Sequence, residues 1–417
     1  MAERKTVREK YSSYKDIKVA VYNIMKNEGK FLVDWLENVK DADYIFLLDT
    51  GSENGEYEIA KGYADAHPEF NGKLFVEQAI IKPWAFHTAR NRNMEMIFDD
   101  DEVDVIYSID LDERVEPGFF DELRKTAWEN DRASDFVYYY AWSHDPETKR
   151  PLRKFGYNKC SFWMKGEIWY DYDVHETLKY SPKYLNFYNA GGAWLNKDIT
   201  WLHHWPDSTK SRGSYLGLLE QRDVHYPDDV YGKFYLAREY SFVGDWAKCA
   251  GTFMRLYNLV SPKNDDMMML PSICLGIAQA LEHSIDKEKE IDFFYQRAIE
   301  YDPTFKDAYM YYAKWLGYQG RPVDSLKVLQ EGESKAKPHY DWREQSAVWE
   351  HWFTANIKGV AYCWLGEYDI AYKIMQEAAD NMESEYQKKE AGWNNFWNDF
   401  EFIKKKVGKN GISEKTD

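Results

Sequence analysis

The chain has 417 residues, a net charge of −17 and 44% hydrophobic residues. This length allows two or three domains with full-sized cores, and this hydrophobic content excludes a disordered chain. The balance of 71 acidic against 54 basic residues disfavours a nucleic acid partner, because binding through the phosphate backbone needs a basic face.

The cysteines and the chain start indicate the compartment. Cys160, Cys249, Cys274 and Cys363 are widely separated and form no C-x-x-C pair, which predicts neither a zinc ribbon nor a dense disulfide framework. Residues 1–10 lack an apolar signal-peptide core, and no run of 18 apolar residues occurs. We therefore expect a soluble protein with no membrane span, in the reducing environment of the cytoplasm.

The first half of the chain alternates strand and helix patterns. Runs of β-forming residues occur at 17–22, 44–48, 74–76 and 105–109, and helical patterns lie between them at 31–39, 57–66 and 85–98. This alternation predicts an α/β domain with a mostly parallel, Rossmann-like mixed sheet, in which ligands bind beyond the carboxyl ends of the strands. Because no G-x-G-x-x-G or G-x-x-x-x-G-K-[ST] motif occurs, dinucleotide and P-loop sites lose their main support.

Polar side chains follow three of the predicted strands. Asn23 and Asp49 come after the first two, and Asp-Leu-Asp-Glu at 110–113 comes after the strand at 105–109. Three carboxylates in four residues repel one another, and burying them unpaired is costly. Mg²⁺ or Mn²⁺ would remove both problems, since such a cation takes carboxylate oxygens and substrate phosphate oxygens. An acidic turn at the start of the next helix is the alternative.

Four short motifs together resemble the family-2 glycosyltransferases. They are Tyr-Asn-Ile-Met-Lys-Asn-Glu at 22–28, Asp-Thr-Gly-Ser at 49–52, Ala-Arg-Asn at 89–91 and Asp-Leu-Asp-Glu at 110–113. The resemblance implies the GT-A fold and a metal-dependent transfer of a sugar from a nucleotide diphosphate sugar, expected to be UDP-linked, to a peptide, protein or glycan acceptor. The candidate donor-site residues are Tyr22, Asn23, Glu28, Asp49, Arg90, Asp110, Lys210 and Arg212.

The resemblance also implies individual roles. Asp49 would read the uracil or ribose of the nucleotide, and Asp110 and Asp112 would hold Mn²⁺ or Mg²⁺ at the diphosphate. His203 and His204 end a further predicted strand, and a histidine late in this kind of domain often completes the metal shell. Because neighbouring side chains of a strand point to opposite faces, we expect only one of the two histidines to bind metal.

Further candidates lie on the acceptor and phosphate sides. An inverting transfer needs a base near the acceptor. Val-His-Glu at 174–176 resembles an acceptor-side motif, so Glu176 is the first choice for that base and His175 the second; a buried His–Glu pair that fixes a loop is the alternative. Lys210 and Arg212 are candidate partners of the diphosphate, and a polar interdomain linker explains them equally well.

From Tyr215 onward, helical periodicity replaces the strand patterns. Small residues at expected helix crossings and turn glycines at Gly244, Gly320 and Gly366 resemble tetratricopeptide repeats, whose unit is about 34 residues. We expect about four degenerate units between Asp229 and Glu383. Their concave side would take an extended peptide or pack on the catalytic domain, and a structural buttress or a homodimerisation arm is the alternative.

The expected fold class is therefore α/β plus all-α. A GT-A domain covers 1–212, a TPR-like helical-repeat domain covers 213–403, and a polar tail covers 404–417. This arrangement resembles S-glycosyltransferases that modify bacteriocin peptides, and phage and bacterial proteins of unknown acceptor. Three other functions stay open: a repeat-based binding or scaffold protein without turnover, a nucleotidyltransferase, and a glycosyltransferase acting on phage nucleic acid.

Overall fold

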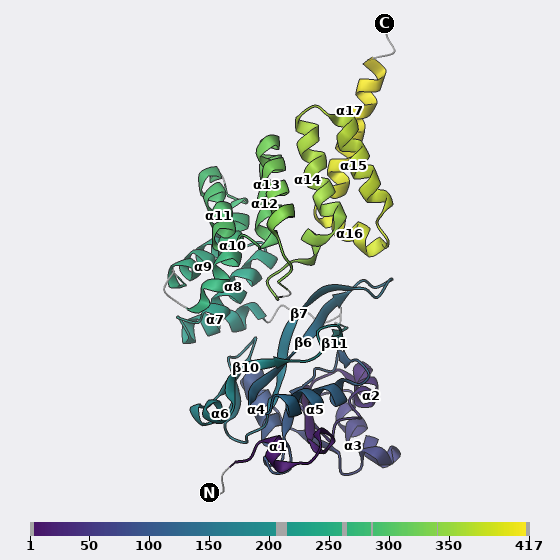
Figure 1. Cartoon of the computed structure of the whole chain (residues 1–417), viewed down its shortest axis with the longest axis vertical. Helices are drawn as coiled ribbons and strands as arrows, with labels where there is room; N and C mark the ends of the chain where they lie inside the picture. Colours follow the sequence, from purple (N-terminus) through teal and green to yellow (C-terminus); the bar gives the residue numbers. More distant parts are fainter. Residues whose placement is uncertain (1–3, 206–214, 261–264, 285–286, 340, 414–417) are drawn as a thin grey trace. The chain divides into compact units, whose positions relative to one another are not determined.

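The computed structural model describes residues 4–205, 215–260, 265–284, 287–339 and 341–413. The chain divides into two compact units, Met1–Ser143 with Lys154–Leu218 and His144–Arg153 with Leu219–Asp417. The first, which we call the α/β unit, is built around a mixed sheet, and the second, the helical unit, is almost entirely α-helical (Figure 1). The expected combination of α/β and all-α parts is confirmed.

The α/β unit contains most of the strands. They are β1 (Val19–Met25), β2 (Tyr44–Asp49), β3 (Leu74–Gln78), β4 (Val105–Ser108), β5 (Glu113–Val115), β6 (Ala133–His144), β7 (Pro151–Phe162), β8 (Ile168–Asp171), β9 (Thr177–Tyr180), β10 (Asn189–Trp194) and β11 (Thr200–His204). The helices of this unit are α1 (Val7–Lys10), α2 (Gly29–Asn38), α3 (Glu56–Ala66), α4 (Phe86–Glu95), α5 (Phe119–Glu129) and α6 (Pro182–Phe187), with 3₁₀ turns η1 (Tyr14–Asp16) and η2 (Pro68–Phe70).

The main sheet is mixed, with strand order β3-β2-β1-β4-β7-β6-β11-β5 and β10 paired to β6. Strands β1 to β4 are parallel, whereas β7 is antiparallel to β4 and β5 is antiparallel to β11. After the hairpin turn that follows β6, the chain forms the single twelve-residue strand β7 and the short strand β8. Gly156 lies within β7 rather than at a turn, and the ring of Trp194 occupies the space that a Cβ at Gly156 would need.

The register of the parallel strands brings their carboxyl ends to one edge, which we call the carboxyl edge. Met25 of β1 pairs with Asp49 of β2, and Tyr22 of β1 pairs with Ser108 of β4. Asp49 ends β2 and Asp110 follows Ser108 by two residues, so both reach this edge, whereas Asn23 lies within β1, level with Leu47 and two residues before the strand ends. Strands β1, β2 and β4 are buried along nearly their whole length, as expected of central parallel strands.

The helical unit is a series of helix pairs. Its helices are α8 (Val230–Phe242), α9 (Trp246–Leu259), α10 (Leu270–Leu281), α11 (Glu288–Tyr301), α12 (Lys306–Tyr318), α13 (Pro322–Lys335), α14 (His351–Trp364), α15 (Tyr368–Asp380), α16 (Glu385–Trp393) and α17 (Phe396–Ser413), with 3₁₀ turns η3 (Asp265–Met269) and η4 (Ser346–Trp349). Helix α7 (Tyr215–His225) contains the point at which the two units divide. The pairs α8–α9, α10–α11, α12–α13 and α14–α15 match the four repeat units expected from the sequence.

Turn glycines join the helices of three pairs, and the last helix, α17, ends the described part of the helical unit. Gly244, Gly320 and Gly366 have φ of 76°, 69° and 82° at the turns within three of the pairs, a left-handed conformation that glycine adopts without steric cost. The expected polar tail from Lys404 is helical as far as Ser413, as a continuation of α17, which Ile403 and aromatic residues anchor in the core. No helix among the described residues is long and apolar enough to cross a lipid bilayer.

Candidate functional site

Arg90 of α4 is the centre of the polar network at the carboxyl edge. Its guanidinium donates hydrogen bonds to Glu176 Oε1 at 2.5 Å, to Ser108 Oγ at 2.9 Å and to Asp110 Oδ1 at 2.8 Å, and it lies 5.6 Å from the centre of the Tyr170 ring. Arg90 is 5% exposed. Burial alone would lower the pKa of Arg90, but the charges of Asp110 and Glu176 outweigh burial and raise it well above the usual value.

Lys159 of β7 neutralises the other side of the same carboxylate. Its Nζ donates to Asp110 Oδ2 at 2.7 Å and lies 3.6 Å from Glu113 Oε1. Against the effect of burial, the Lys159 and Arg90 charges hold the pKa of Asp110 far below its usual range, whereas burial raises the pKa of Glu113. Both oxygens of Asp110 therefore already bond to cationic side chains.

Asp112 pairs with one of the two adjacent histidines, and the other histidine pairs elsewhere. His204 Nε2 lies 3.2 Å from Asp112 Oδ2, whereas His203 Nε2 lies 2.8 Å from Glu116 Oε1 and 3.0 Å from the carbonyl of Thr200. Burial lowers the pKa of His204, but its hydrogen bond to Asp112 outweighs burial and raises it. The structure thus brings His204 to the predicted acidic segment and directs His203 to a separate carboxylate.

Asn23 and Asp49 supply buried polar atoms without partners. Asn23 is 1% exposed, and neither its Oδ1 nor its Nδ2 has a hydrogen-bond partner within the described part of the chain. The same holds for Asp49 Oδ2, while Asp49 Oδ1 accepts from the backbone of Gly51 and Ser52 and from Gln78. Buried polar atoms are nearly always hydrogen-bonded, so these atoms point to a ligand or to ordered water.

Two other predicted donor residues have mainly structural surroundings. Tyr22 is fully buried, and its hydroxyl lies 2.9 Å from the hydroxyl of Tyr170, so its side chain acts on the site only through the Tyr170 ring. Glu28 is the residue before α2, and its carbonyl accepts from the amide of Phe31 at 2.9 Å. Lys210 and Arg212, the predicted phosphate partners, lie outside the described residues.

The loop before β9 carries both predicted acceptor-side residues. Tyr172 and His175 have φ of 78° and 50°, left-handed conformations that are uncommon for residues other than glycine and that often mark functional sites. The ion pair of Glu176 with Arg90 fixes one end of this loop. Glu176 thus pairs with an arginine, whereas the alternative offered by the sequence was a buried pair of Glu176 with His175.

The donor set fits a divalent cation held by few protein ligands. Among the described residues, no group of three or more His, Cys, Asp or Glu side chains is arranged to hold a metal. Asp112 and His204 lie together, however, and Mg²⁺ usually binds to one or two carboxylates while substrate phosphates and water complete its shell. Because Arg90 and Lys159 occupy Asp110, the two predicted aspartate ligands have unequal surroundings.

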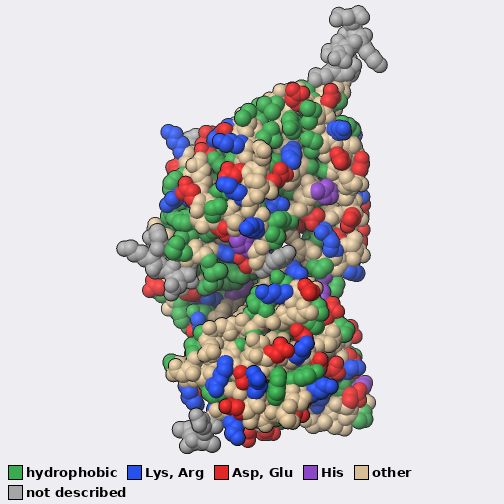
Figure 2. Space-filling model, in the orientation of Figure 1, with side chains coloured by type: hydrophobic (Ala, Val, Ile, Leu, Met, Phe, Trp, Pro, Cys, Tyr) green, Lys and Arg blue, Asp and Glu red, His purple; other side chains and the backbone are tan. Residues whose placement is uncertain are grey.

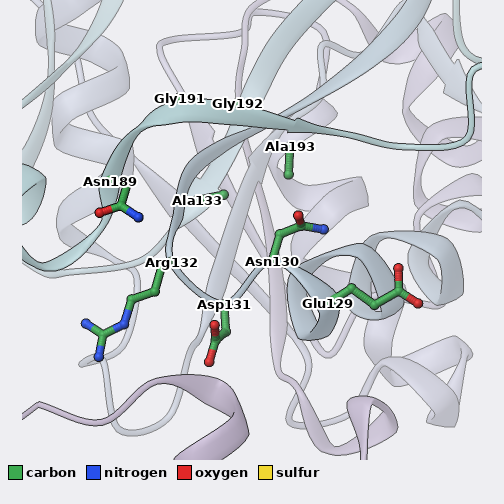
Figure 3. A pocket seen from close by; sticks show the side chains of 9 residues that line it. All are labelled: Glu129, Asn130, Asp131, Arg132, Ala133, Asn189, Gly191, Gly192 and Ala193. Carbon is green, nitrogen blue, oxygen red and sulfur yellow. The ribbon is translucent and has the colours of Figure 1, made fainter.

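A surface pocket of about 350 Å³ lies elsewhere, at the turn between α5 and β6 (Figure 3). Its lining consists of Glu129, Asn130, Asp131, Arg132, Ala133, Asn189, Gly191, Gly192 and Ala193. Ala133 begins β6, so the pocket lies at the opposite end of that strand from Ala141, which pairs with β11. The side chains of Glu129, Asp131 and Arg132 point in different directions in Figure 3, and we do not regard this pocket as part of the site.

Comparisons with known proteins return helical-repeat structures. The chain is similar to the crystal structure of MamA (16% identity, 40% of this chain and 83% of that chain, TM-score 0.32). It is also similar to YrrB, described as a TPR protein with an unusual peptide-binding site (12%, 43% and 82%, 0.31), and to TTC0263, a TPR protein of Thermus thermophilus (13%, 45% and 89%, 0.33). No protein-family model and no curated protein sequence matches the chain.

These comparisons correct the family assignment made from the sequence. The similar structures are repeat proteins and not glycosyltransferases, so the assignment to the family-2 glycosyltransferases with a GT-A domain is wrong, and only its TPR-like part is kept. The physical reason is that the quoted motifs are short and also serve as turns. Asp49 Oδ1 accepts a hydrogen bond from the amide of Ser52, and Glu113 Oε2 accepts one from the amide of Asp110 at 2.9 Å. Side-chain caps of this kind can form turns at the strand ends of any parallel sheet.

Sequence reasoning missed two residues of the network. Lys159 was part of a basic segment without an assigned role, and Tyr170 was not singled out. Each comes from a strand that follows the predicted parallel sheet, β7 and β8, and β7 returns antiparallel beside β4. The pairing of β7 with β4, which brings Lys159 to Asp110, is a tertiary contact that no local pattern reveals.

Proposed function

We propose that this chain is a repeat-based binding protein whose helical unit holds a peptide or protein segment. Four stacked helix pairs make an extended surface that repeat proteins use for binding. Large side chains remain exposed on the helical unit, including Trp364 (61%) at the end of α14 and Trp393 (64%) at the end of α16. Exposed aromatic residues are typical anchors of protein interfaces. These exposed anchors are the observation that carries the proposal; a homodimer through the same helices is the alternative partner.

The test is selection of binding peptides on the full-length chain. A displayed library of random dodecapeptides should yield peptides that bind. Trp364→Ala or Trp393→Ala should weaken the affinity for the selected peptides about tenfold or more, which is the effect of losing an interface anchor. Val224→Ala, which truncates an exposed residue of α7 (77% exposed), is the control. The proposal fails if no peptide is selected or if both tryptophan variants bind like the control. Sedimentation velocity at two concentrations detects the homodimer.

A second function is proposed for the α/β unit: cation-dependent transfer of a sugar from a nucleotide diphosphate sugar, with UDP as the expected nucleotide. The observation that favours it is the convergence of several unrelated segments at the carboxyl edge. His204 Nε2 lies 3.2 Å from Asp112 Oδ2, and Asn23 and Asp49 offer buried polar atoms that lack partners among the described residues. A base and a ribose carry the donors and acceptors that these atoms need.

The residues of this edge have separable roles in the proposal. Asp112 and His204 would hold Mn²⁺ or Mg²⁺, and a bound cation would neutralise the diphosphate leaving group. Arg90 positions Glu176, which stays the first choice for the base that deprotonates the acceptor, with His175 the second. Glu176 must exchange its bond to Arg90 for the acceptor before it takes a proton. The sugar would then be inverted at its anomeric carbon.

Matched histidine variants test the second function. We expect UDP or a UDP-sugar with Mn²⁺ to raise the melting temperature of the wild type, because a ligand that binds only the folded state stabilises it by mass action. Asp112→Asn and His204→Ala should abolish this shift, and His203→Ala, which alters the neighbouring His–Glu pair, should keep it. The donor site is refuted if no nucleotide sugar raises the melting temperature of the wild type, or if His203→Ala loses this increase as fully as Asp112→Asn and His204→Ala do.

The remaining partner and location expectations follow the surface chemistry. Basic and acidic side chains are interspersed on the face drawn in Figure 2, and the net charge is −17, so a nucleic acid acceptor gains no support. The described cysteines are free thiols, which suits the reducing, cytoplasmic location that we keep as part of the proposal. We keep a peptide, protein or glycan as the proposed acceptor of the sugar.

A further inference from the structure

Trp142 is a partly exposed indole at the end of β6, beside the candidate site. It is 43% exposed, yet its position is fixed from two sides. Its ring centre lies 4.6 Å from that of His204 and 5.9 Å from that of Tyr140. Its backbone carbonyl accepts from His204 Nδ1 at 2.9 Å. A ring that is already ordered loses little conformational entropy when a ligand binds to it.

The support beneath Trp142 is rigid and aromatic. Tyr140 is 1% exposed, stacks on Tyr157 with centres 5.0 Å apart, and meets Phe155 edge-on at 5.4 Å. Trp142 therefore ends an aromatic row that begins in the core of the sheet. A ring needed only for core packing would be buried like Tyr140, because exposing an aromatic face to water forfeits its hydrophobic stabilisation. The exposed part of Trp142 is available to a ligand.

The surroundings of Trp142 define the chemistry of that ligand. The His204 imidazole contacts the Trp142 ring and also bonds to Asp112. An apolar ring face therefore lies next to hydrogen-bonding groups. A pyranose has the matching pattern, with C–H groups on one face and hydroxyls around its edge. An apolar side chain would leave the polar groups unused, and an acidic ligand would be repelled by the Asp112 carboxylate.

We propose that Trp142 is a stacking platform for a pyranose ring of a neutral glycan acceptor. The proposal rests on the sugar-transfer function of the α/β unit and deepens it, since it names the acceptor class. Trp142 would orient the acceptor by contact with its C–H face, while the edge hydroxyls face the Asp112–His204 pair. Trp142 is a binding residue in this account and takes no part in proton transfer.

The test measures binding of three neutral oligosaccharides, cellohexaose, maltohexaose and chitohexaose, to the full-length protein by isothermal titration calorimetry. At least one should bind, and Trp142→Ala should weaken it about fivefold to tenfold, the effect of losing one aromatic contact. Trp142→Phe should keep part of the affinity. Trp169→Ala is the control, because Trp169 is similarly exposed (41%) but neighbours Tyr170 in β8 and so points to the opposite face of that strand.

Each outcome decides the proposal. It is overturned if none of the three oligosaccharides binds, if Trp142→Ala and Trp169→Ala lose affinity equally, or if Trp142 is required only for peptides selected on the full-length chain. Binding of UDP with Mn²⁺ to the wild type is measured in parallel. If UDP fails to bind the wild type while Trp142-dependent oligosaccharide binding persists, the donor site is refuted and the acceptor platform stands.

Discussion

Replacing Arg90 by leucine tests whether the network at the carboxyl edge is a buried ionic network, as its geometry indicates. Arg90 is 5% exposed and makes three hydrogen bonds, two of them to carboxylates. In Arg90→Leu, Glu176 loses its cationic partner, and Asp110 keeps only Lys159. An ionised carboxylate left buried without a partner pays a desolvation penalty that nothing offsets.

The expected magnitude follows from burial. Removing one partner of a buried ion pair costs about 3–5 kcal/mol. Because the side chains of Asp110 and Glu176 are 32% and 13% exposed and Lys159 remains on Asp110, we expect about 2 kcal/mol. Arg92 offers a matched control two residues along the same helix. Its ion pairs with Glu77 and Glu95 have side-chain exposures of 38% to 68%, and exposed pairs of this kind contribute about 0–1 kcal/mol. Arg92→Leu should therefore be nearly neutral.

Urea denaturation followed by circular dichroism gives the two free energies of unfolding, and hydrogen exchange of peptides from β1 and β4 assigns the loss to the α/β unit. The pKa of Asp110 is depressed in the folded state, so its contribution to stability is present above its unfolded pKa and is lost as pH falls. The deficit of Arg90→Leu should therefore stay constant from pH 7 to about 4 and shrink only as the pH falls below about 4. Equal losses in the two leucine variants, or a deficit independent of pH, would refute the reasoning.

Two further predictions concern the helical unit. A Cβ at Gly332 would lie 2.5 Å from Tyr309 Cβ, whereas a Cβ at Gly251 would meet nothing within 4 Å. Gly332→Ala should therefore lower the free energy of unfolding by about 1–3 kcal/mol, and Gly251→Ala should raise it by about 0.5–1 kcal/mol. Thermal unfolding measures both changes. Burial and the charge of Glu350 raise the pKa of Glu390 to about 7, so stability is lost as pH rises through 7. Glu390→Gln should gain about 1–2 kcal/mol over the wild type at pH 8 and little at pH 5, and an equal gain at both pH values would contradict this.

Local sequence patterns predicted the elements of the fold that depend on local chemistry. The alternation of strands and helices, the turn glycines such as Gly320 and the four helix pairs all follow from periodicity and turn preference. Local patterns did not predict which distant strands pair with one another. Strand β7 contains Gly156, and the ring of Trp194 fills the space beside this glycine, a contact that depends on the pairing of distant strands.

For the candidate site, the sequence identified the strand ends and missed their partners. Asn23, Asp49 and Asp110 were placed at one edge by the rule that ligands bind beyond the carboxyl ends of parallel strands. The observed register puts Asp49 and Asp110 there, whereas Asn23 lies inside β1, which continues to Met25. The ion pairs of Arg90 and Lys159 arise from α4 and β7, and side-chain partners of this kind depend on tertiary packing. The same limitation produced the wrong family assignment, since short motifs at strand ends record turn geometry as readily as ancestry.

The charge balance at the carboxyl edge separates the structural part of the network from the part suited to a ligand. The side chains concerned are the cations Arg90 and Lys159 and the carboxylates Asp110, Asp112, Glu113 and Glu176. The two cations bond to Asp110 and Glu176, and the raised pKa of Glu113 shows that its surroundings favour the neutral form. Asp112 instead pairs with His204 and also interacts with the charge of Arg114. A divalent cation would therefore find its protein ligands at Asp112 and His204 without breaking the bonds of Arg90, which makes these two residues the most informative positions to change.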